Sequence, residues 1–450
     1  MKNIWFFLLL LLAGFTACSD DEGGTAAPAI PGAPTEPRGP FRRTVLFYIS
    51  GENNLSSFIP SELREIREGS KGIGNNACVV YVDDTNPNRN PYILWIVDGV
   101  TKDSLTFETD PLSSSPETLT RVLRHTSDYY PAEEYGLILW GHASGWILED
   151  SLSLSSSSVP VRRKAFGVDN GSNTTSGSGK WMNISTLART LWEWKHLKFV
   201  FADCCQFQCV ETAYELRNVT DYLIGSPAEI PGEGAPYDKV VKGLFDPSDS
   251  FYRVIADAYS SQTRQSTYYS YTGWEDFPYT SRTPISVVRT SRLLDLAKAT
   301  HAVLNTILSG IGQSSPDLLQ SKLIYYMGNN SSSKYSVMYD MNDFVRYYTK
   351  EIGKETAYDT WKKVFDQTVV YRTNASSGWL TSGQIMSYVF RDGILTDERY
   401  GGVSMFVPQN RSGTHYEPYR SNSGSLFEGY NAEIRKTAWY SAAGLSDFGW

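Results

Sequence analysis

The sequence predicts an α/β fold, in which helices cover both faces of a mostly parallel central sheet and a mainly helical C-terminal region follows. Runs of residues that are apolar at every position recur in the first half of the chain. Such runs are typical of strands that are buried on both faces of a sheet. Segments with apolar residues at helical spacing separate these runs, as expected for the crossover helices between parallel strands.

Three apolar runs open the folded part of the chain: "TVLFYIS" at 44–50, "ACVVYVDD" at 77–84 and "YILWIVDG" at 92–99. The first of them ends in the turn-like stretch "GENNL". The third follows the second closely, and a short connection suits antiparallel strands. We therefore expect these two runs to form a hairpin at one edge of the sheet.

A helix is predicted where "SPETLTRVLRHTSDYY" follows at 115–130. Ser115 is a residue type that caps helix N-termini, and Pro116 suits the first helical position. Leu119, Val122 and Leu123 then fall on one face of the helix, which indicates that this face packs on the sheet.

Strands and helices continue to alternate after this helix. The next predicted elements are the strand "GLILW" at 136–140, the helix "ISTLARTLWEW" at 184–194, the strand "HLKFVFADCC" at 196–205, the helix "QCVETAYELRN" at 208–218 and the strand "TDYLIGSP" at 220–227. Beyond about residue 282 a further strand leads into long helical segments. We expect this later half to pack on the sheet and to complete part of it.

The N-terminus reads as an export signal rather than as part of the fold. One lysine precedes an apolar run that ends at "FTAC", and the run is too short for a stable membrane span. "FTAC" resembles a bacterial lipobox, so Cys18 is expected to be the lipidated first residue of the mature chain, carrying acyl chains such as palmitate. Residues 18–40 are rich in Pro, Gly and Ala, which is typical of a flexible tether. We expect a cell-envelope lipoprotein of the outer membrane, and the sequence leaves open whether the chain is exposed at the cell surface.

Reactive side chains follow two of the predicted strands. His142 comes soon after "GLILW", and Asp203, Cys204 and Cys205 end "KFVFAD" and follow it. The carboxyl ends of parallel strands share one edge of a sheet, where ligands bind. If the two strands are neighbours, a thiol and an imidazole face the same crevice, as nucleophile and proton-transfer partner. A helix expected to begin near Cys205 would lower the pKa of its thiol.

Four segments in the same order resemble the clostripain-like cysteine peptidases, which are relatives of caspases, gingipains and legumains and have the caspase-hemoglobinase fold. "TVLFYISGENNL" resembles the opening strand and its acidic-Asn-Asn-Leu turn, with Glu52 where Asp is common. "YPAEEYGLILWGHASGW" resembles the histidine segment, and "FGVDNGS" with "MNISTLARTL" resembles the next block. In the segment that begins "FADCCQFQCVE", Asp203, Cys205 and Glu211 fit the pattern of the family's nucleophile segment.

The resemblance implies a role for each matching residue. Cys205 is the expected nucleophile and His142 its partner, while the backbone amides of Cys205 and Ala143 are expected to hold the oxyanion. The family has glycine where this chain has Ala143, a difference that matters only if the position requires a positive φ. Asp203 is expected to bind the substrate's P1 side chain, and Ser226 to form a wall of the same pocket.

The other cysteines are expected to be structural. Cys204 and Cys209 are interpreted as small buried residues, and adjacent cysteines do not bridge easily, so no disulfide framework is expected. The spacing of Cys and His residues also gives no support for a metal site. We expect no cofactor, and the sequence leaves a need for calcium open.

The expected function is therefore a cysteine endopeptidase that cleaves after Arg or Lys, acting on peptides or proteins. Two alternatives stay open: a catalytically degenerate lipoprotein that binds peptide or glycan on the same scaffold, and a thiol-disulfide protein that uses the cysteine cluster. The net charge of −8 and the lack of a long Lys/Arg cluster argue against nucleic acid as a partner. A monomer is expected.

The domains implied by this reading are a signal peptide at 1–17, the tether at 18–40, a caspase-like catalytic domain at 41–280 and a C-terminal region at 281–450.

A serine-rich tract between the histidine and cysteine segments leads to "RRK" and Ala165. Exposed polar linkers of this kind are preferred cleavage sites. Two interpretations of this stretch stay open: a site at which a peptidase with basic specificity cuts itself after Lys164, and a solvated basic patch.

Overall fold

A nine-stranded sheet forms the centre of the computed structural model. The structure describes residues 30–147, 166–171, 179–262, 264–265, 268–270, 273–275, 280–312, 316, 322–327, 338–373, 379–381, 384–385, 395–407, 420–421, 424–425, 431 and 433–450. Along the sheet the strand order is β16-β14-β9-β8-β5-β1-β2-β3-β4.

The five inner strands run parallel. They are β1 (Phe41–Gly51), β2 (Asn76–Asp84), β5 (Ala132–Trp140), β8 (Leu197–Asp203) and β9 (Thr220–Gly225). All five were predicted as apolar runs, and their central residues are buried on both faces. The expected hairpin at one edge is also present, with β3 (Tyr92–Val97) antiparallel to β2.

Three further strands extend the sheet at its two edges, and the apolar pattern of the sequence did not predict all of their positions and pairings. β4 (Val100–Thr106) follows β3 after a tight turn, and its mostly exposed residues suit an edge strand. At the opposite edge β14 (Ser286–Arg289) pairs antiparallel with β9, and β16 (Val369–Arg372) pairs antiparallel with β14. The chain beyond residue 280 therefore contributes strands to the central sheet itself.

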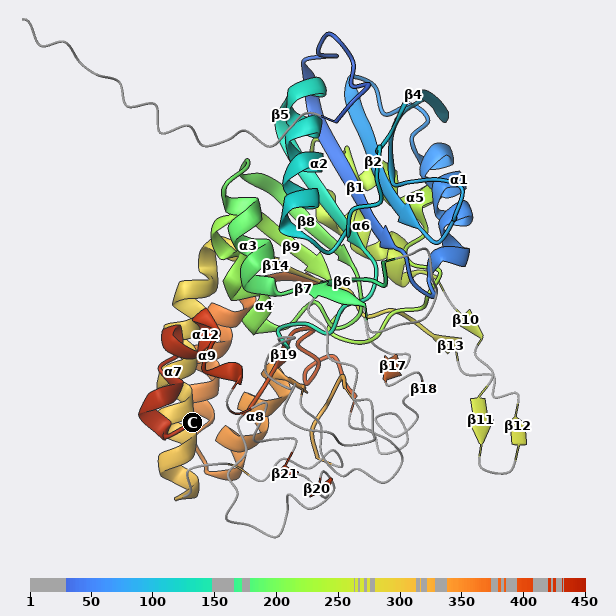
Figure 1. Cartoon of the computed structure of the whole chain (residues 1–450). Coiled ribbons are helices and arrows are strands. Elements are labelled where there is room, and N and C mark those ends of the chain that lie inside the picture. The colour runs from blue at the N-terminus through green and yellow to red at the C-terminus, as the bar shows by residue number, and fades with distance from the viewer. Residues whose placement is uncertain are drawn as a thin grey trace, which may run out of the picture.

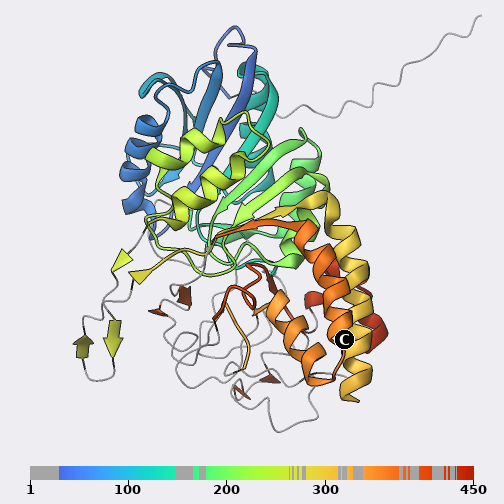
Figure 2. The same cartoon turned by 180° about the vertical axis from the view of Figure 1, so that it is seen from behind.

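Helices cover both faces of this sheet (Figures 1 and 2), so the expected three-layer sandwich is confirmed. On one face lie α1 (Ile59–Gly69), α5 (Tyr237–Leu244) and α6 (Phe251–Ser260), and their apolar residues share one core with the sheet. On the other lie α2 (Pro116–Tyr129), α3 (Ile184–Trp192) and α4 (Val210–Glu215), which belong to a second core. As predicted, Ser115 caps α2, accepting a hydrogen bond from the Thr118 N–H.

The second core continues into the C-terminal region. It includes residues of α7 (Leu293–Ile311), α8 (Met341–Glu351), α9 (Glu355–Thr368) and α12 (Ala438–Ala442), which gather beyond the side of the sheet that β14 and β16 form (Figure 1). Short strands pair locally: β6 (Phe166–Asp169) with β7 (Lys180–Met182), β15 (Tyr339–Asp340) with β19 (Ser404–Met405), β10 (Arg264–Gln265) with β13 (Thr280–Ser281), β11 (Tyr268–Ser270) with β12 (Gly273–Glu275), β17 (Leu380–Thr381) with β18 (Gln384–Ile385), and β20 (Arg420–Ser421) with β21 (Gly424–Ser425).

The C-terminal region also contacts the chain that follows β8. The Ser404 N–H donates to the Gln208 carbonyl at 3.1 Å, and the Phe406 N–H donates to Oε1 of Glu211 at 2.7 Å. The Ala438 N–H at the start of α12 donates to Glu215 of α4 at 2.6 Å.

In the described part of the chain, no helix is both long and apolar enough to cross a bilayer.

Candidate active site

The register of two neighbouring strands brings His142 and Cys205 to the same edge of the sheet. β5 and β8 are parallel, and Trp140 at the end of β5 is paired with Asp203 at the end of β8. His142 and Cys205 each lie two residues beyond this pair. The carboxyl ends of parallel strands are where open α/β sheets build their sites, so the expected neighbourhood of the two strands is present.

The loops that carry these residues pack against each other. Gly145 has a φ of +67°, and a Cβ atom at this position would lie 2.8 Å from the carbonyl oxygen of Gln206 and 3.0 Å from Sγ of Cys209. Gly145 is therefore required both for its backbone conformation and for the close approach. The approach holds the loop at 141–147 against the loop at 204–209.

His142 is held from the end of β1. Its Nε2 atom lies 2.7 Å from Oδ1 of Asn54, which belongs to the turn that follows β1. Its ring centroid lies 6.3 Å from that of Trp181, and its carbonyl accepts a hydrogen bond from the Gly167 N–H at 2.8 Å. The imidazole is half-buried, so its orientation is fixed while it stays accessible.

Cys205 is the one accessible thiol among the described cysteines. It is half-buried, whereas Cys78, Cys204 and Cys209 are buried, as was expected for the last two. Sγ of Cys205 lies 3.4 Å from the backbone nitrogen of Ile230. Burial raises the pKa of Cys204 well above its usual value and raises that of Cys209 to about 12. Neither of these two thiols is prepared to ionise near neutral pH.

The helix that follows Cys205 begins later than expected. α4 starts at Val210 and ends at Glu215, so the expectation that a helix N-terminus lies at Cys205 and lowers its pKa is wrong. The intervening residues form a turn in which Gln206 has a φ of 57°. The N–H groups of Gln206 and Gln208 donate to the carbonyls of Ala228 and Ser226, so these donors are already used outside a helix.

Ala143 does not adopt a backbone conformation that requires glycine. The non-glycine residues with positive φ in the described part of the chain are Asp98 and Gln206. Ala143 pairs instead with Phe166 in an isolated antiparallel bridge. The substitution of alanine for glycine therefore does not strain the backbone after His142.

Asp203 is buried at the end of β8, with 1% of its surface exposed. Its Oδ2 accepts hydrogen bonds from the Ala235 N–H at 2.9 Å and from the Tyr237 hydroxyl at 2.8 Å, and its Oδ1 accepts one from the Tyr259 hydroxyl at 2.7 Å. Ser226 is also buried, and its hydroxyl accepts from the Ala228 N–H at 3.1 Å. Both side chains thus have structural partners on the β8 and β9 side of the site.

Three other predicted positions, Cys18, Lys164 and Ala165, lie outside the described residues.

A model of the clostripain family, Peptidase_C11, matches residues 47–442 and so spans most of the chain. The chain belongs to the clostripain family. This is a family of cysteine-type peptidases, and the resemblance expected from the four sequence segments is confirmed.

Individual relatives agree with the family assignment. Clostripain of Hathewaya histolytica is 22% identical over 223 residues, which cover 44% of this chain and 41% of clostripain. The chain thus spans less than half the length of that relative. A secreted C11 cysteine protease from Bacteroides thetaiotaomicron, solved with an irreversible peptide inhibitor, is 27% identical with a TM-score of 0.63 and covers 90% of this chain and 99% of its own. An inactive zymogen C11 protease from Parabacteroides distasonis is 24% identical with the same TM-score of 0.63 and covers the same shares.

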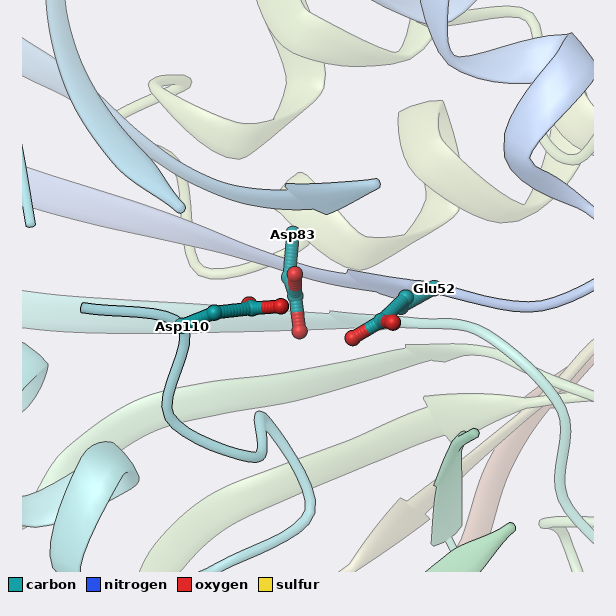
Figure 3. Close-up of side chains that lie close together, drawn as sticks. All are labelled: Glu52, Asp83 and Asp110. Carbon is teal, nitrogen blue, oxygen red and sulfur yellow. The ribbon is translucent and has the colours of Figure 1, made fainter. Parts of the chain in front are cut away.

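Two features of the site were not predicted from the sequence. The contact of Asn54 with His142 was not foreseen, although the turn "GENNL" follows a strand whose end reaches the same edge. The second is a group of carboxylates, Glu52, Asp83 and Asp110 (Figure 3). Glu52 and Asp83 also follow or end adjacent parallel strands, so the rule that identified His142 and Cys205 could have identified them.

Proposed function

We propose that the protein is a cysteine endopeptidase that hydrolyses peptide bonds after Arg or Lys, with Cys205 as nucleophile and His142 as proton-transfer partner. The observation that carries the proposal is the register of β5 and β8, which pairs Trp140 with Asp203 two residues before each reactive side chain. Cys205 is also the accessible cysteine of its cluster.

The chemistry assigned to these groups follows the acyl-transfer pattern. The Cys205 thiolate attacks the scissile carbonyl and forms a thioester as the C–N bond breaks. His142 donates a proton to the departing amine and then takes one from the water that hydrolyses the thioester. The backbone N–H groups of Cys205 and Ala143 stabilise the oxyanion of each tetrahedral intermediate.

Asn54 supports a particular assignment of the histidine nitrogens. An amide oxygen accepts and does not donate, so the contact with Oδ1 of Asn54 favours a proton on Nε2 of His142. Nδ1 is then the nitrogen that gains and loses the proton of the reaction. Fixing one ring nitrogen in this way selects both the tautomer and the orientation of the imidazole.

The preference for basic P1 residues rests on Asp203. A carboxylate in a largely dry environment attracts a guanidinium or ammonium group strongly. The two tyrosine hydroxyls and the amide that donate to Asp203 stabilise it as an anion. They also leave the carboxylate with a fixed position at the end of β8.

The test is a comparison of two adjacent cysteines. Wild type, Cys205→Ala and Cys204→Ala are treated with a biotinylated Arg-acyloxymethylketone and assayed on peptides with Arg at P1. We expect stoichiometric labelling and hydrolysis in wild type, neither in Cys205→Ala, and most of both in Cys204→Ala. Equal losses of labelling and hydrolysis in the two variants would contradict the assignment of Cys205 as the nucleophile. An unlabelled, inactive wild type would favour a binding protein on the same scaffold.

We also propose that Cys18 anchors the mature chain to a cell-envelope membrane, on the strength of the "FTAC" stretch. Membrane and soluble fractions of cells that express wild type or Cys18→Ala would be compared by immunoblot. The variant should move to the soluble fraction, since loss of the acyl chains removes the anchor. Continued membrane association of the variant would count against lipidation.

A further inference from the structure

The loop that follows β9 brings one peptide group against the thiol of Cys205. The Ile230 N–H donates a hydrogen bond to Sγ of Cys205 at 3.4 Å, and the Ile230 carbonyl lies 3.8 Å from the same sulfur. A thiolate only accepts hydrogen bonds, so it uses the N–H, whereas a protonated thiol donates to the carbonyl. The N–H is the nearer group, and a hydrogen bond to the charged form stabilises that form.

The position of this peptide group is set by backbone hydrogen bonds that precede it in the loop. The Gln206 N–H donates to the Ala228 carbonyl at 2.8 Å, and the Gln208 N–H donates to the Ser226 carbonyl at 3.0 Å. One chain advances by two residues while the other goes back by two, which is the register of an antiparallel pair. Continued by a further step, this register brings the residues after Ala228 alongside Cys205.

The loop is also fixed beyond Ile230. The Gly234 N–H donates to the Pro231 carbonyl at 3.1 Å, and the Ala235 N–H donates to Oδ2 of Asp203 at 2.9 Å. A proline restricts the residue before it to extended backbone, so Pro231 limits the conformations open to Ile230. The loop is therefore held on both sides of Ile230, and its N–H group is in place before the thiol ionises.

A donor at this point takes over a role that a helix N-terminus was expected to have. α4 begins at Val210, five residues beyond Cys205, so its N-terminus does not lie at the thiol. The thiolate and not the thiol is the nucleophile, and a thiol with an ordinary pKa is mostly protonated near neutral pH. Hydrogen bonds to an ionised group are stronger than those between neutral groups. One preformed backbone donor therefore promotes the ionisation that α4 is too distant to promote.

We propose that the backbone N–H of Ile230 stabilises the thiolate of Cys205, and that the loop at 226–235 thereby sets the reactivity of the nucleophile. The consequence for peptide hydrolysis rests on the proposed function, whereas the ionisation of Cys205 does not.

Other titratable groups lie on the segments around Cys205, and a test has to leave them unchanged. They are His142, Asp203, Cys204, Glu229 and Glu233. A substitution at Ile230 replaces none of these groups. A pair of substitutions there, one of which removes the N–H while the other keeps it, separates the backbone donor from the side chain.

Ile230→Pro removes the N–H and Ile230→Ala keeps it, so the two variants form a matched pair. Each full chain is treated with iodoacetamide over a range of pH, and the rate of alkylation of Cys205 gives the pKa of its thiol. The other described cysteines are buried, and peptide mass analysis identifies the labelled residue. We expect Ile230→Pro to raise this pKa by at least about one unit, which lowers the rate below the pKa about tenfold. Ile230→Ala should alkylate as wild type does.

A second measurement does not depend on whether Ile230→Pro folds. The chain is labelled with ¹⁵N-isoleucine, and the amide signal that disappears in Ile230→Val belongs to Ile230. In wild type the chemical shift of this amide proton should change with pH at the pKa that alkylation gives. Alkylation of Cys205 should move the signal upfield, because the sulfur then no longer accepts as an anion. A merely structural role of the loop would lower the melting temperature without coupling these two titrations.

The proposal is overturned if Ile230→Pro folds and alkylates with the pH dependence of wild type, or if the Ile230 amide signal does not follow the thiol. Equal rises of the thiol pKa in Ile230→Pro and Ile230→Ala would overturn it too, because they would assign the effect to the side chain. A thiol that responds as expected in a wild-type chain that hydrolyses no peptide would count against the proposed function and leave the role of Ile230 intact.

Discussion

Nε2 of His142 lies 2.7 Å from Oδ1 of Asn54, which joins the end of β5 to the turn after β1. The two strands are parallel neighbours, with Ile49 paired with Trp140. The contact is thus made between two adjacent strand ends and needs no long loop. A rigid strand end is well suited to hold an imidazole in one orientation.

Replacing Asn54 with alanine should reduce kcat/KM on a peptide with Arg at P1 by about tenfold to a hundredfold, because a small displacement of a catalytic group is costly. The pH profile should shift as well, since the amide no longer favours a proton on Nε2 of His142. Asn54 is exposed, so the melting temperature should change little. Steady-state kinetics across pH and a thermal melt measure these effects.

Asn88→Ala is the matched control, because Asn88 is also an exposed asparagine in a loop after a strand of the same sheet. It should leave both the rate and the pH profile as in wild type. If Asn54→Ala keeps the wild-type pH profile and rate, the contact with His142 has no part in the reaction.

Asp203→Asn separates a specificity role from a structural one. The change removes the charge and keeps the size, so kcat/KM for Arg at P1 should fall at least about tenfold relative to a neutral P1 residue, as expected for the loss of a charge-assisted hydrogen bond. Stability should fall too, because the Ala235 N–H and two tyrosine hydroxyls lose an anionic acceptor. Kinetics with paired Arg and norleucine substrates give the ratio.

Tyr259→Phe supplies the control for Asp203, since it removes one donor to Oδ1 and no charge. It should lower stability while leaving the ratio between the two substrates near that of wild type. If Asp203→Asn lowers stability and leaves the same ratio, Asp203 is a structural residue and basic specificity must come from another group.

Glu211→Gln should flatten the dependence of stability on pH. Burial raises the pKa of Glu211 to about 7 in the folded chain, above its ordinary value. Between these two values the folded state keeps a proton that the unfolded state releases, so the free energy of unfolding falls as pH rises from about 5 to 7. Glutamine removes this term and keeps an oxygen to accept from the Phe406 N–H.

Urea unfolding at several pH values between 5 and 8, in chains that also carry Cys205→Ala, measures the effect. Asp340, whose pKa burial raises to about 6, changes stability in the same direction, so the difference in slope between the two chains is the readout. Equal slopes with and without Glu211→Gln would show that Glu211 is not protonated preferentially in the folded state.

The sequence was most informative where one physical rule acts locally. The buried parallel strands are apolar at every position, and α2 begins at the cap that Ser115 and Pro116 define, so these elements could be predicted. His142 and Cys205 could be found because each follows such a strand. The pattern of buried strands did not predict which side chains contact His142 and Cys205. Those contacts depend on which strands are neighbours, and strand pairing joins residues that are far apart in the sequence.

Other features depend on tertiary contacts that no local pattern encodes. Residues 205–209 have a composition compatible with a helix. However, the N–H groups of Gln206 and Gln208 donate to the carbonyls of Ala228 and Ser226. Because these donors are used outside a helix, α4 begins only at Val210. Asp83 lies near the end of an apolar run that is typical of a buried strand, and nothing in the run itself indicates a cluster of carboxylates. Its proximity to Asp110 arises because the segment after β4 folds back over the end of β2, which the sequence does not show.

The last prediction is that the chain cuts itself after Lys164. The bond between Lys164 and Ala165 lies outside the described residues, but the structure describes both sides of the linker. On one side the loop carrying His142 continues to the buried Ile147, and on the other β6 begins at Phe166, which pairs with Ala143. The described residues on both sides of the linker therefore lie beside the candidate active site of a peptidase expected to cleave after basic residues.

Cleavage there should leave the two fragments associated. β5 belongs to the first fragment and β8 to the second, and they are paired from Gly136 to Trp140 within one sheet. The cut would thus leave β5 and β8 intact and paired. Purified wild type, Cys205→Ala and Lys164→Ala would be compared by denaturing gel, gel filtration and N-terminal sequencing. Wild type should show a new N-terminus at Ala165 with both fragments eluting together, Cys205→Ala should stay intact, and Lys164→Ala should lack that end. A wild-type chain that is intact and fully active would refute self-processing.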